Sequence, residues 1–297
     1  MTADAMARRV MGTTAHVMLN GGSLTPEDVV DELDRLESCW TRFRADSELN
    51  RLNAAAGRIT VVSPTLLTLV EHLVSASRLT GGRFDPTMRD QIAGLGYDRT
   101  YRQLPSDAPA AGETRPAERC DDIVVVSSTS TVLLPAGTAL DPGGLGKGLA
   151  ADLAADLAMS AGAHGVLVEI GGDIVTRGDA PGGGLWRIEI PAVGDRPEQI
   201  AELRDGAVAT SDTDVRTWVR GGELHRHILD PATGRSLQRG LTATVVAGAG
   251  WWAEAVATAA IVSTARSDGW IEEFRDGRHG GDSVASVQVT EREPVDA

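Results

Sequence analysis

The sequence predicts one large domain in which helices and strands both contribute to a common core. Its 297 residues, of which 42% are hydrophobic, are enough to bury a core of this size. Apolar residues alternate with polar ones in some segments, as in strands, and recur every three or four positions in others, as in helices. We therefore expect a domain over residues 10–290, preceded by an N-terminal extension (residues 1–9) and followed by an acidic tail (residues 291–297).

The first part of the chain predicts a strand and three helices. Residues 10–19 have the alternation of a strand with one buried face. Thr25, Ser47 and Ser63 each stand where a side-chain oxygen can cap the first turn of a helix, and Thr25 and Ser63 are followed by proline. Residues 99–122 show neither period, so we expect an irregular surface segment there.

Beyond residue 122 the patterns of strands and of buried helices continue. Leu149, Leu153 and Leu157 are four apart and predict the buried face of a helix that ends near Ser160. A run of small residues over 253–260 predicts another helix. The strands expected here are residues 123–126, 131–134, 166–170, 186–190 and 241–247, with a last one through Val284, Val287 and Val289.

The charge balance and the cysteines exclude several classes of protein. A formal net charge of -14 leaves no basic excess with which to bind nucleic acid. Cys39 and Cys120 are too few and too far apart for a metal-binding pattern, and they indicate ordinary thiols in a reducing compartment. The sequence has no run of 18 apolar residues, and no apolar segment follows Arg8 and Arg9 as in a secretion signal. We therefore expect a cytoplasmic protein without a membrane segment.

A glycine-rich turn between Asp141 and Asp152 predicts a site for an anion. Four glycines and Lys147 stand where this turn enters a helix. Glycines let the backbone approach a phosphate closely, and the helix N-terminus and the ammonium group add positive potential. The alternative is a tight connection with Lys147 in solvent. The spacing fits neither a P-loop nor the dinucleotide-binding fingerprint.

Three further patterns carry groups suited to chemistry. Gly171-Gly172-Asp173 follows an apolar strand and predicts either a hairpin turn or a site with a carboxylate. His225 and His227 would share one strand face, either as a zinc pair or with one working histidine beside an Asp-Pro turn. Glu254 and Thr258 are four apart on one helix face, where their oxygens suit a hard cation such as Mg²⁺. The alternative is a solvent-facing Glu and a Thr that bonds back to its own turn.

Taken together, these motifs resemble the ApbE family of FAD:protein FMN transferases. The matching blocks follow one another in order from about residue 10 to residue 289. They are Met11-Gly12-Thr13, Arg42-Phe43 through Ser47 to Leu52-Asn53, Gly82-Arg83-Phe84-Asp85-Pro86, Leu95-Gly96-Tyr97-Asp98, Asp141 through Asp152, Gly171-Gly172-Asp173, Ala209-Thr210-Ser211, His227 through Gly234, and Ala253 through Thr258.

The resemblance implies a single α+β domain similar to the T-fold class, with mixed or antiparallel sheets and packed helices. It implies that the protein binds FAD with Mg²⁺ and transfers the FMN half to a threonine hydroxyl of a partner flavoprotein, releasing AMP. Metal and lysine charges would neutralise the pyrophosphate before a hydroxyl attacks it. The residues that the resemblance assigns are Met11, Asp85, Asp141, Lys147 and Ile228 for FAD, the Gly144 carbonyl, Glu254 and Thr258 for the metal, and His227 as a proton shuttle or phosphate contact.

Two departures from the family pattern concern acidic residues. Glu254 stands where the family usually has Asp, and its extra methylene moves the carboxylate by about 1.5 Å. Asp212 stands where Gly is common, and it adds negative charge near an anionic ligand. The lipobox cysteine of many relatives is absent, which favours a cytoplasmic acceptor. The alternatives to transfer are a Mg²⁺-dependent FAD pyrophosphatase, in which water replaces the acceptor hydroxyl, and a non-catalytic flavin carrier.

Overall fold

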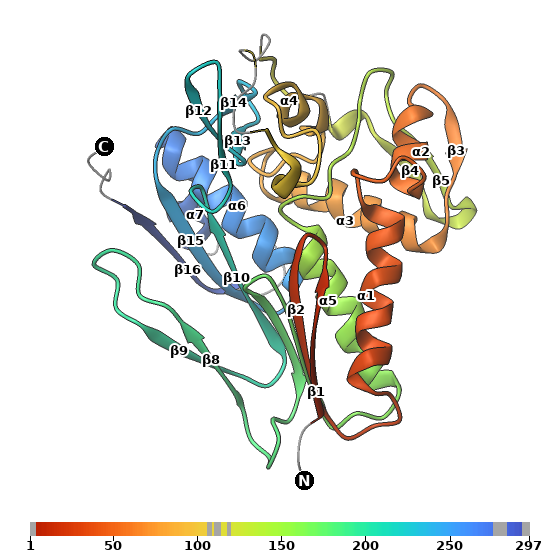
Figure 1. The fold of residues 1–297 in the computed structure, drawn as a ribbon, viewed down its shortest axis with the longest axis vertical. Helices are drawn as coiled ribbons and strands as arrows, with labels where there is room; N and C mark the ends of the chain where they lie inside the picture. The colour runs from red at the N-terminus through yellow and green to blue at the C-terminus, as the bar shows by residue number, and fades with distance from the viewer. Residues whose placement is uncertain (1–3, 106–108, 110–113, 118–119, 276–283, 293–297) are drawn as a thin grey trace.

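A seven-stranded antiparallel sheet runs through the centre of the molecule (Figure 1). The computed structural model describes residues 4–105, 109, 114–117, 120–275 and 284–292. Neighbouring strands pair antiparallel throughout this sheet, which confirms the predicted α+β class. In spatial order the strands are β1 (Asp4–Val10), β2 (Thr13–Asn20), β6 (Gly165–Ile170), β7 (Asp173–Gly178), β10 (Gly206–Asp212), β15 (Leu241–Ala247) and β16 (Val284–Glu291).

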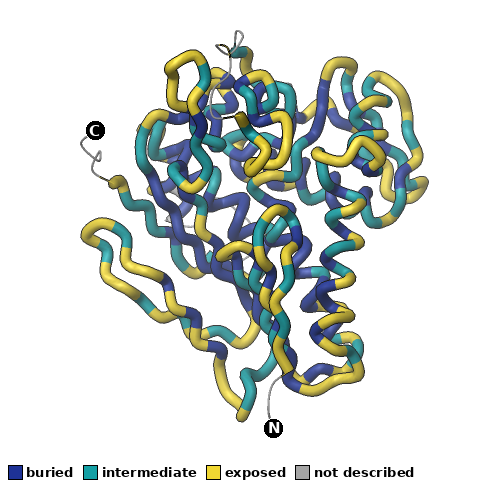
Figure 2. The backbone as a smooth tube through the Cα atoms, in the orientation of Figure 1, coloured by how far each residue is buried: buried dark blue, intermediate teal, exposed yellow. Residues whose placement is uncertain are grey.

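Three long helices cover one face of this sheet, and the main core lies between the two layers (Figures 1 and 2). They are α1 (Pro26–Trp40), α5 (Gly146–Ser160) and α6 (Gly250–Arg266). The two central helices, α5 and α6, are rich in alanine and glycine, so they can approach the sheet and each other closely. No described helix combines the length and the apolar character that a membrane crossing requires.

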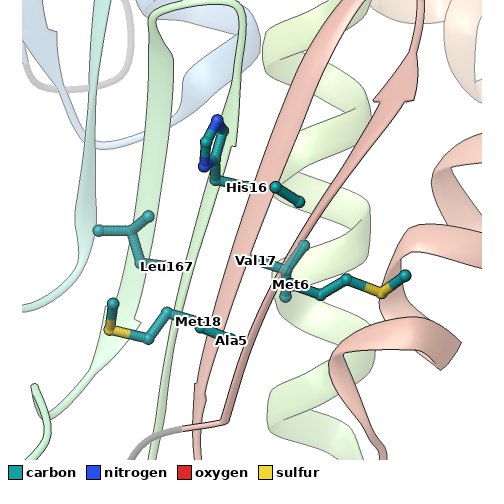
Figure 3. Close-up of a pocket in the computed structure, with 7 residues that line it drawn as sticks. Ala5, Met6, His16, Val17, Met18 and Leu167 are labelled. Atoms are coloured by element: carbon teal, nitrogen blue, oxygen red, sulfur yellow. The ribbon is translucent and has the colours of Figure 1, made fainter.

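A two-stranded hairpin, β8 (Trp186–Ile190) and β9 (Gln199–Leu203), lies on the other face of the sheet. Trp186, Ile188 and Ile190 pack there against Val208 and Val246 of the central strands. Beside the hairpin, an open groove of about 270 Å³ crosses β1, β2 and β6 (Figure 3). It is lined by Ala5, Met6, Ala7, His16, Val17, Met18 and Leu167, and it contains none of the predicted site residues.

Shorter elements cluster at the end of the sheet where the glycine-rich turn lies. A three-stranded sheet and two hairpins form there with three short helices and one long one. These elements are α2 (Glu48–Ala54), α3 (Pro64–Leu79), α4 (Arg89–Gly94), α7 (Trp270–Arg275), β3 (Ile59–Val61), β4 (Val124–Val126), β5 (Thr131–Leu133), β11 (Thr217–Arg220), β12 (Glu223–Arg226), β13 (Leu229–Asp230) and β14 (Arg235–Ser236), with 3₁₀ turns at Tyr101–Gln103, Cys120–Asp122 and Ser127–Thr129.

Local sequence signals predicted the starts of α1, α2 and α3 correctly. Thr25, Ser47 and Ser63 each accept a backbone N–H of the first turn, as expected of helix caps. The buried face of α5 differs from the prediction, because alanines fill it and Leu157 is 40% exposed. Of the irregular segment 99–122, the described parts include two 3₁₀ turns, and residues 106–108, 110–113 and 118–119 lie outside the described residues.

The predicted strand over residues 10–19 is in fact a hairpin. Met11 and Gly12 have φ angles of 52° and 74°, the left-handed pair that joins two strands by a two-residue turn. Residues 4–9, which we expected in an N-terminal extension, therefore form most of strand β1 at the sheet edge. At the other end, β16 continues to Glu291, and residues 293–297 lie outside the described residues.

Candidate active site

Lys147 lies in the first turn of α5 with its ammonium group between two carboxylates. Its Nζ donates to Oε1 of Glu254 over 2.5 Å and also to Oδ2 of Asp173. The Lys147 side chain is only 28% exposed, which excludes the alternative of a lysine in solvent. Burial works against its charge, but the two carboxylates more than offset burial and raise the pKa of Lys147, so the group is an ammonium ion at neutral pH.

The close crossing of α5 and α6 brings Glu254 to Lys147. A Cβ on Gly148 would lie 2.2 Å from the Gly250 carbonyl oxygen, so only glycine fits at this crossing. The Gly148 N–H donates to Oε2 of Glu254 over 2.8 Å. Burial, together with nearby Asp173, raises the pKa of Glu254 despite its contact with Lys147. Glu254 thus faces the N-terminus of α5 and not solvent.

A second buried acid on α5 holds the start of α6. Oδ1 and Oδ2 of Asp152 accept the N–H groups of Gly250 and Trp251, each over 2.9 Å. Arg177 pairs with the same carboxylate over 2.9 Å. Asp152 therefore caps α6 from a neighbouring helix, a role that the matching sequence block did not reveal.

Asp173 is the site residue to which sequence reasoning assigned no role. It is the first residue of β7, directly after the Gly171-Gly172 turn, and it is 3% exposed. Its Oδ1 accepts the Thr210 N–H over 3.1 Å, while its Oδ2 accepts from Lys147. The predicted hairpin turn is confirmed, because β6 and β7 pair antiparallel around Gly171-Gly172, and the Asp173 carboxylate faces Lys147.

Gly144 lies beside Thr258, which is one turn further along α6 than Glu254. A Cβ on Gly144, whose φ is 82°, would lie 3.1 Å from the Thr258 hydroxyl oxygen. That hydroxyl also lies 3.2 Å from Oγ of Ser211. A carboxylate, a hydroxyl and a backbone carbonyl are the oxygen donors that Mg²⁺ takes, so the residues present fit this ion in their chemistry. Among the described residues, no group of three or more His, Cys, Asp or Glu could hold a metal.

The predicted FAD residues Asp85 and Asp141 are placed by adjoining turns. Asp141 pairs with Arg42 Nε over 2.9 Å, and its backbone N–H donates to the Pro86 carbonyl over 2.8 Å. Asp85 accepts the N–H of Thr87 over 2.8 Å, and burial raises the pKa of Asp85. The turn with Asp85 and the turn with Asp141 therefore form one unit beside the start of α5.

His227 and His225 do not share a strand face. His225, in β12, is buried with its ring centroid 6.0 Å from that of Trp218. His227 follows β12, and its Nδ1 lies 3.3 Å from the Arg216 carbonyl oxygen. Burial, the Arg216 guanidinium and the charge of Lys147 lower the pKa of His227 to about 4, although the Arg216 carbonyl and Asp212 act in the opposite direction. His227 is therefore neutral at pH 7. It lies beyond the end of β12, so the predicted strand face shared with His225 is wrong.

The remaining predicted ligands, Met11 and Ile228, both belong to the main core or pack against it. Met11 occupies the β1–β2 turn, and its N–H donates to Oε2 of Glu37 over 2.7 Å. The neighbouring Thr13 contacts the Gly171 turn that leads to Asp173. Ile228 follows His227 and is 6% exposed.

Asp212 does not present an uncompensated charge. Its Oδ2 accepts the Thr242 hydroxyl over 2.8 Å and pairs with Arg292, and its Oδ1 accepts the Asp214 N–H over 2.8 Å. Arg292 therefore reduces the expected penalty for an anionic ligand, and no local pattern connects it with Asp212.

The sequence is similar to a family of known proteins over nearly its whole length. Residues 11–278 match the model of the ApbE family. A FAD:protein FMN transferase of Vibrio cholerae is 29% identical over 265 residues, which cover 85% of this chain and 79% of that protein. A FAD:protein FMN transferase of Treponema pallidum is 31% identical over 230 residues, which cover 70% of this chain and 62% of that protein.

Solved structures of ApbE proteins share the fold of this chain. The apo flavinyl transferase ApbE of Pseudomonas stutzeri superposes with a TM-score of 0.78 at 25% identity, covering 98% of this chain and 92% of that chain. An ApbE protein of Thermotoga maritima gives a TM-score of 0.82 at 22% identity, covering 98% and 97%.

Proposed function

Because this chain belongs to the ApbE family, we propose that it transfers FMN from FAD to a threonine hydroxyl of a partner flavoprotein and releases AMP. The observation that carries the proposal is the buried ammonium of Lys147, set at a helix N-terminus between Asp173 and Glu254. A chain with a net charge of -14 binds a pyrophosphate only where local positive charge is concentrated. Lys147 and the first turn of α5 contribute to that concentration. Because Asp173 and Glu254 outnumber the single ammonium, a divalent cation would supply the remaining positive charge.

The pyrophosphate of FAD is positioned by this end of α5. The positive end of the α5 helix dipole favours the phosphates, and the Lys147 ammonium stabilises the negative charge that builds up on them. The acceptor hydroxyl oxygen forms a new bond to the FMN phosphorus, and the bond from that phosphorus to the bridging oxygen breaks. AMP leaves with the bridging oxygen.

We assign the magnesium ion to Glu254, Thr258 and the Gly144 carbonyl, the donors whose chemistry fits it. When bound there, Mg²⁺ supplies further positive charge to the pyrophosphate. The hydroxyl of Ser211 lies against Thr258 and orients it. The longer side chain of Glu254 is accommodated because the Gly148 N–H holds its Oε2.

His227 is the group that receives the proton of the acceptor hydroxyl. A carbonyl oxygen only accepts, so the contact with Arg216 places the ring proton on Nδ1. Nε2 then carries a free lone pair, and the pKa of about 4 keeps it unprotonated at neutral pH. These two features favour a proton shuttle over a charged phosphate contact.

The test is incubation of the full chain with FAD and Mg²⁺ and a threonine-containing candidate acceptor peptide. We expect AMP release and a peptide mass gain of one FMN less one water. A peptide with Val in place of the threonine is the control, and it should gain no mass. Release of free FMN and AMP at the same rate without peptide would identify a pyrophosphatase instead. Intact FAD bound to the protein after addition of Mg²⁺ would identify a flavin carrier.

A further inference from the structure

We infer that Asp173 is a positioning residue that retains the Lys147 ammonium when a cation takes the Glu254 carboxylate. The inference rests on the metal site of the proposed function. In the structure the ammonium contacts both carboxylates. It therefore already binds the Glu254 carboxylate that a cation would also bind.

Both carboxylates are held in place by backbone groups, so neither follows the ammonium. Oδ1 of Asp173 accepts the Thr210 N–H over 3.1 Å, and Oε2 of Glu254 accepts the Gly148 N–H over 2.8 Å. The Asp173 and Glu254 side chains are 5% and 4% exposed. The mobile partner is Lys147, whose flexible side chain can pivot between the two acids.

A divalent ion at Glu254 competes directly with Lys147. Oε1 of Glu254 is already bound by the ammonium, and an ammonium and Mg²⁺ repel each other at the same oxygen. Cation binding therefore requires Lys147 to leave Oε1. Because the lysine is largely buried, leaving without a second partner would strand an unpaired charge in the protein interior.

Asp173 provides that second partner. Its Oδ2 already contacts Nζ, so the ammonium keeps a charged hydrogen bond when it leaves Oε1 of Glu254 to the cation. The free energy needed to release Glu254 is lower with Asp173 than without it. Asp173 thus favours metal binding through Lys147 and without ligating the metal itself.

The composition of the chain makes this exchange directly observable. Lys147 is the only lysine in the sequence, since every other side chain counted as Lys or Arg is Arg. Full-length protein labelled with ¹³C at lysine Cε therefore gives one lysine signal that needs no assignment. Mg²⁺ is titrated without flavin, and the signal reports both the metal affinity and the environment of the ammonium.

We expect Mg²⁺ to move the Lys147 signal of the parent protein to a second chemical shift. The signal should stay equally narrow, because the ammonium remains ordered. Asp173→Asn keeps the side-chain volume and an acceptor for Thr210 but removes the charge. This substitution should weaken Mg²⁺ binding at least tenfold.

Asp156→Asn is the matched control, because Asp156 is a 62% exposed acid on α5, the helix that carries Lys147. The Asp156→Asn variant should bind Mg²⁺ like the parent.

Calorimetric Mg²⁺ titration of Lys147→Gln and of Lys147→Gln with Asp173→Asn separates a relay from a direct electrostatic effect. Without the lysine, loss of Asp173 should change the affinity less than threefold. An unchanged affinity in Asp173→Asn alone, or a tenfold loss that persists in the Lys147→Gln background, would overturn the relay while leaving the metal site intact. Absence of Mg²⁺ binding by the parent would overturn the metal site itself.

Discussion

At the scale of single residues, His227 shows how a neighbouring carbonyl and a neighbouring cation prepare a neutral imidazole. The Arg216 carbonyl fixes the proton on Nδ1, while burial and the Arg216 guanidinium disfavour a second proton. The charge of Lys147 adds to this effect. The two thiols show the opposite consequence of burial, which raises the pKa of Cys39 and Cys120 to about 12 and leaves both unreactive at neutral pH.

We expect the His227 ring to titrate near pH 4 in the folded protein, compared with about 6.5 in the unfolded chain. Its contribution to stability is therefore complete above about pH 6.5 and is lost as the pH falls from there towards 4, because the unfolded state takes up the proton first. NMR of the histidine ring signals against pH measures the midpoint directly. The signal is identified by its absence in His227→Gln.

The same substitution should lower turnover by ~10²–10⁴-fold while changing FAD affinity little, as expected for loss of a proton acceptor. His225→Gln is the control, since His225 packs on Trp218 away from the site, and it should affect thermal stability more than turnover. A loss in His227→Gln of less than about tenfold would make His227 a phosphate contact.

At the scale of secondary structure elements, the site depends on how closely α5 and α6 cross. Gly148 and Gly250 meet backbone to backbone, and this contact places Glu254 beside the N-terminus of α5. Asp152 strengthens the same crossing by capping α6. The crossing of α5 and α6 therefore contributes to packing and also brings Glu254 to Lys147.

Gly148→Ala should destabilise the protein by about 1–3 kcal/mol, because its Cβ would overlap the Gly250 carbonyl and force the helices apart. It should also weaken Mg²⁺ binding, since Glu254 moves with α6. Thermal or denaturant unfolding and a metal titration measure the two effects. Gly94→Ala in α4, where a Cβ meets nothing within 4 Å, should leave both quantities nearly unchanged. Equal stability of the two variants would contradict the close crossing.

At the scale of the whole molecule, most of the predicted FAD residues lie on loops and turns between the main elements. The turns with Met11, Asp85, Asp141 and Asp173 come from four separate parts of the chain. A ligand that bridges them links elements that are otherwise joined through the central sheet. We therefore expect FAD and Mg²⁺ together to stabilise the entire fold.

FAD at about 100 times its dissociation constant should add about 2.7 kcal/mol to the free energy of unfolding. For a domain of this size, the melting temperature should rise by about 5 °C. Mg²⁺ should add a further increase in the parent and none in Glu254→Gln, which loses the charge of one ligand at nearly constant volume. Differential scanning calorimetry with each ligand alone and with both measures these shifts. The same Mg²⁺ increment in Glu254→Gln would argue against Glu254 as a ligand.

The sequence by itself determined the features that depend on neighbouring residues. The caps at Thr25, Ser47 and Ser63, the strand Leu241–Ala247 and the glycine-rich turn before α5 follow from short-range hydrogen bonding and periodicity. The order of the motifs also indicated the family and most of the candidate site residues.

Only the tertiary structure decided which groups meet. Lys147 contacts Asp173, which lies 26 positions further along the chain, and Glu254, which lies 107 positions further. No local pattern encodes either contact. The Met11-Gly12 turn, which makes a hairpin of a predicted single strand, lacks the usual Asn-Gly signal. Asp212 looked like an unfavourable charge because Arg292, which neutralises it, lies 80 residues further along the chain. Local propensities fix the elements, whereas burial and pairing of charges between distant elements fix the site.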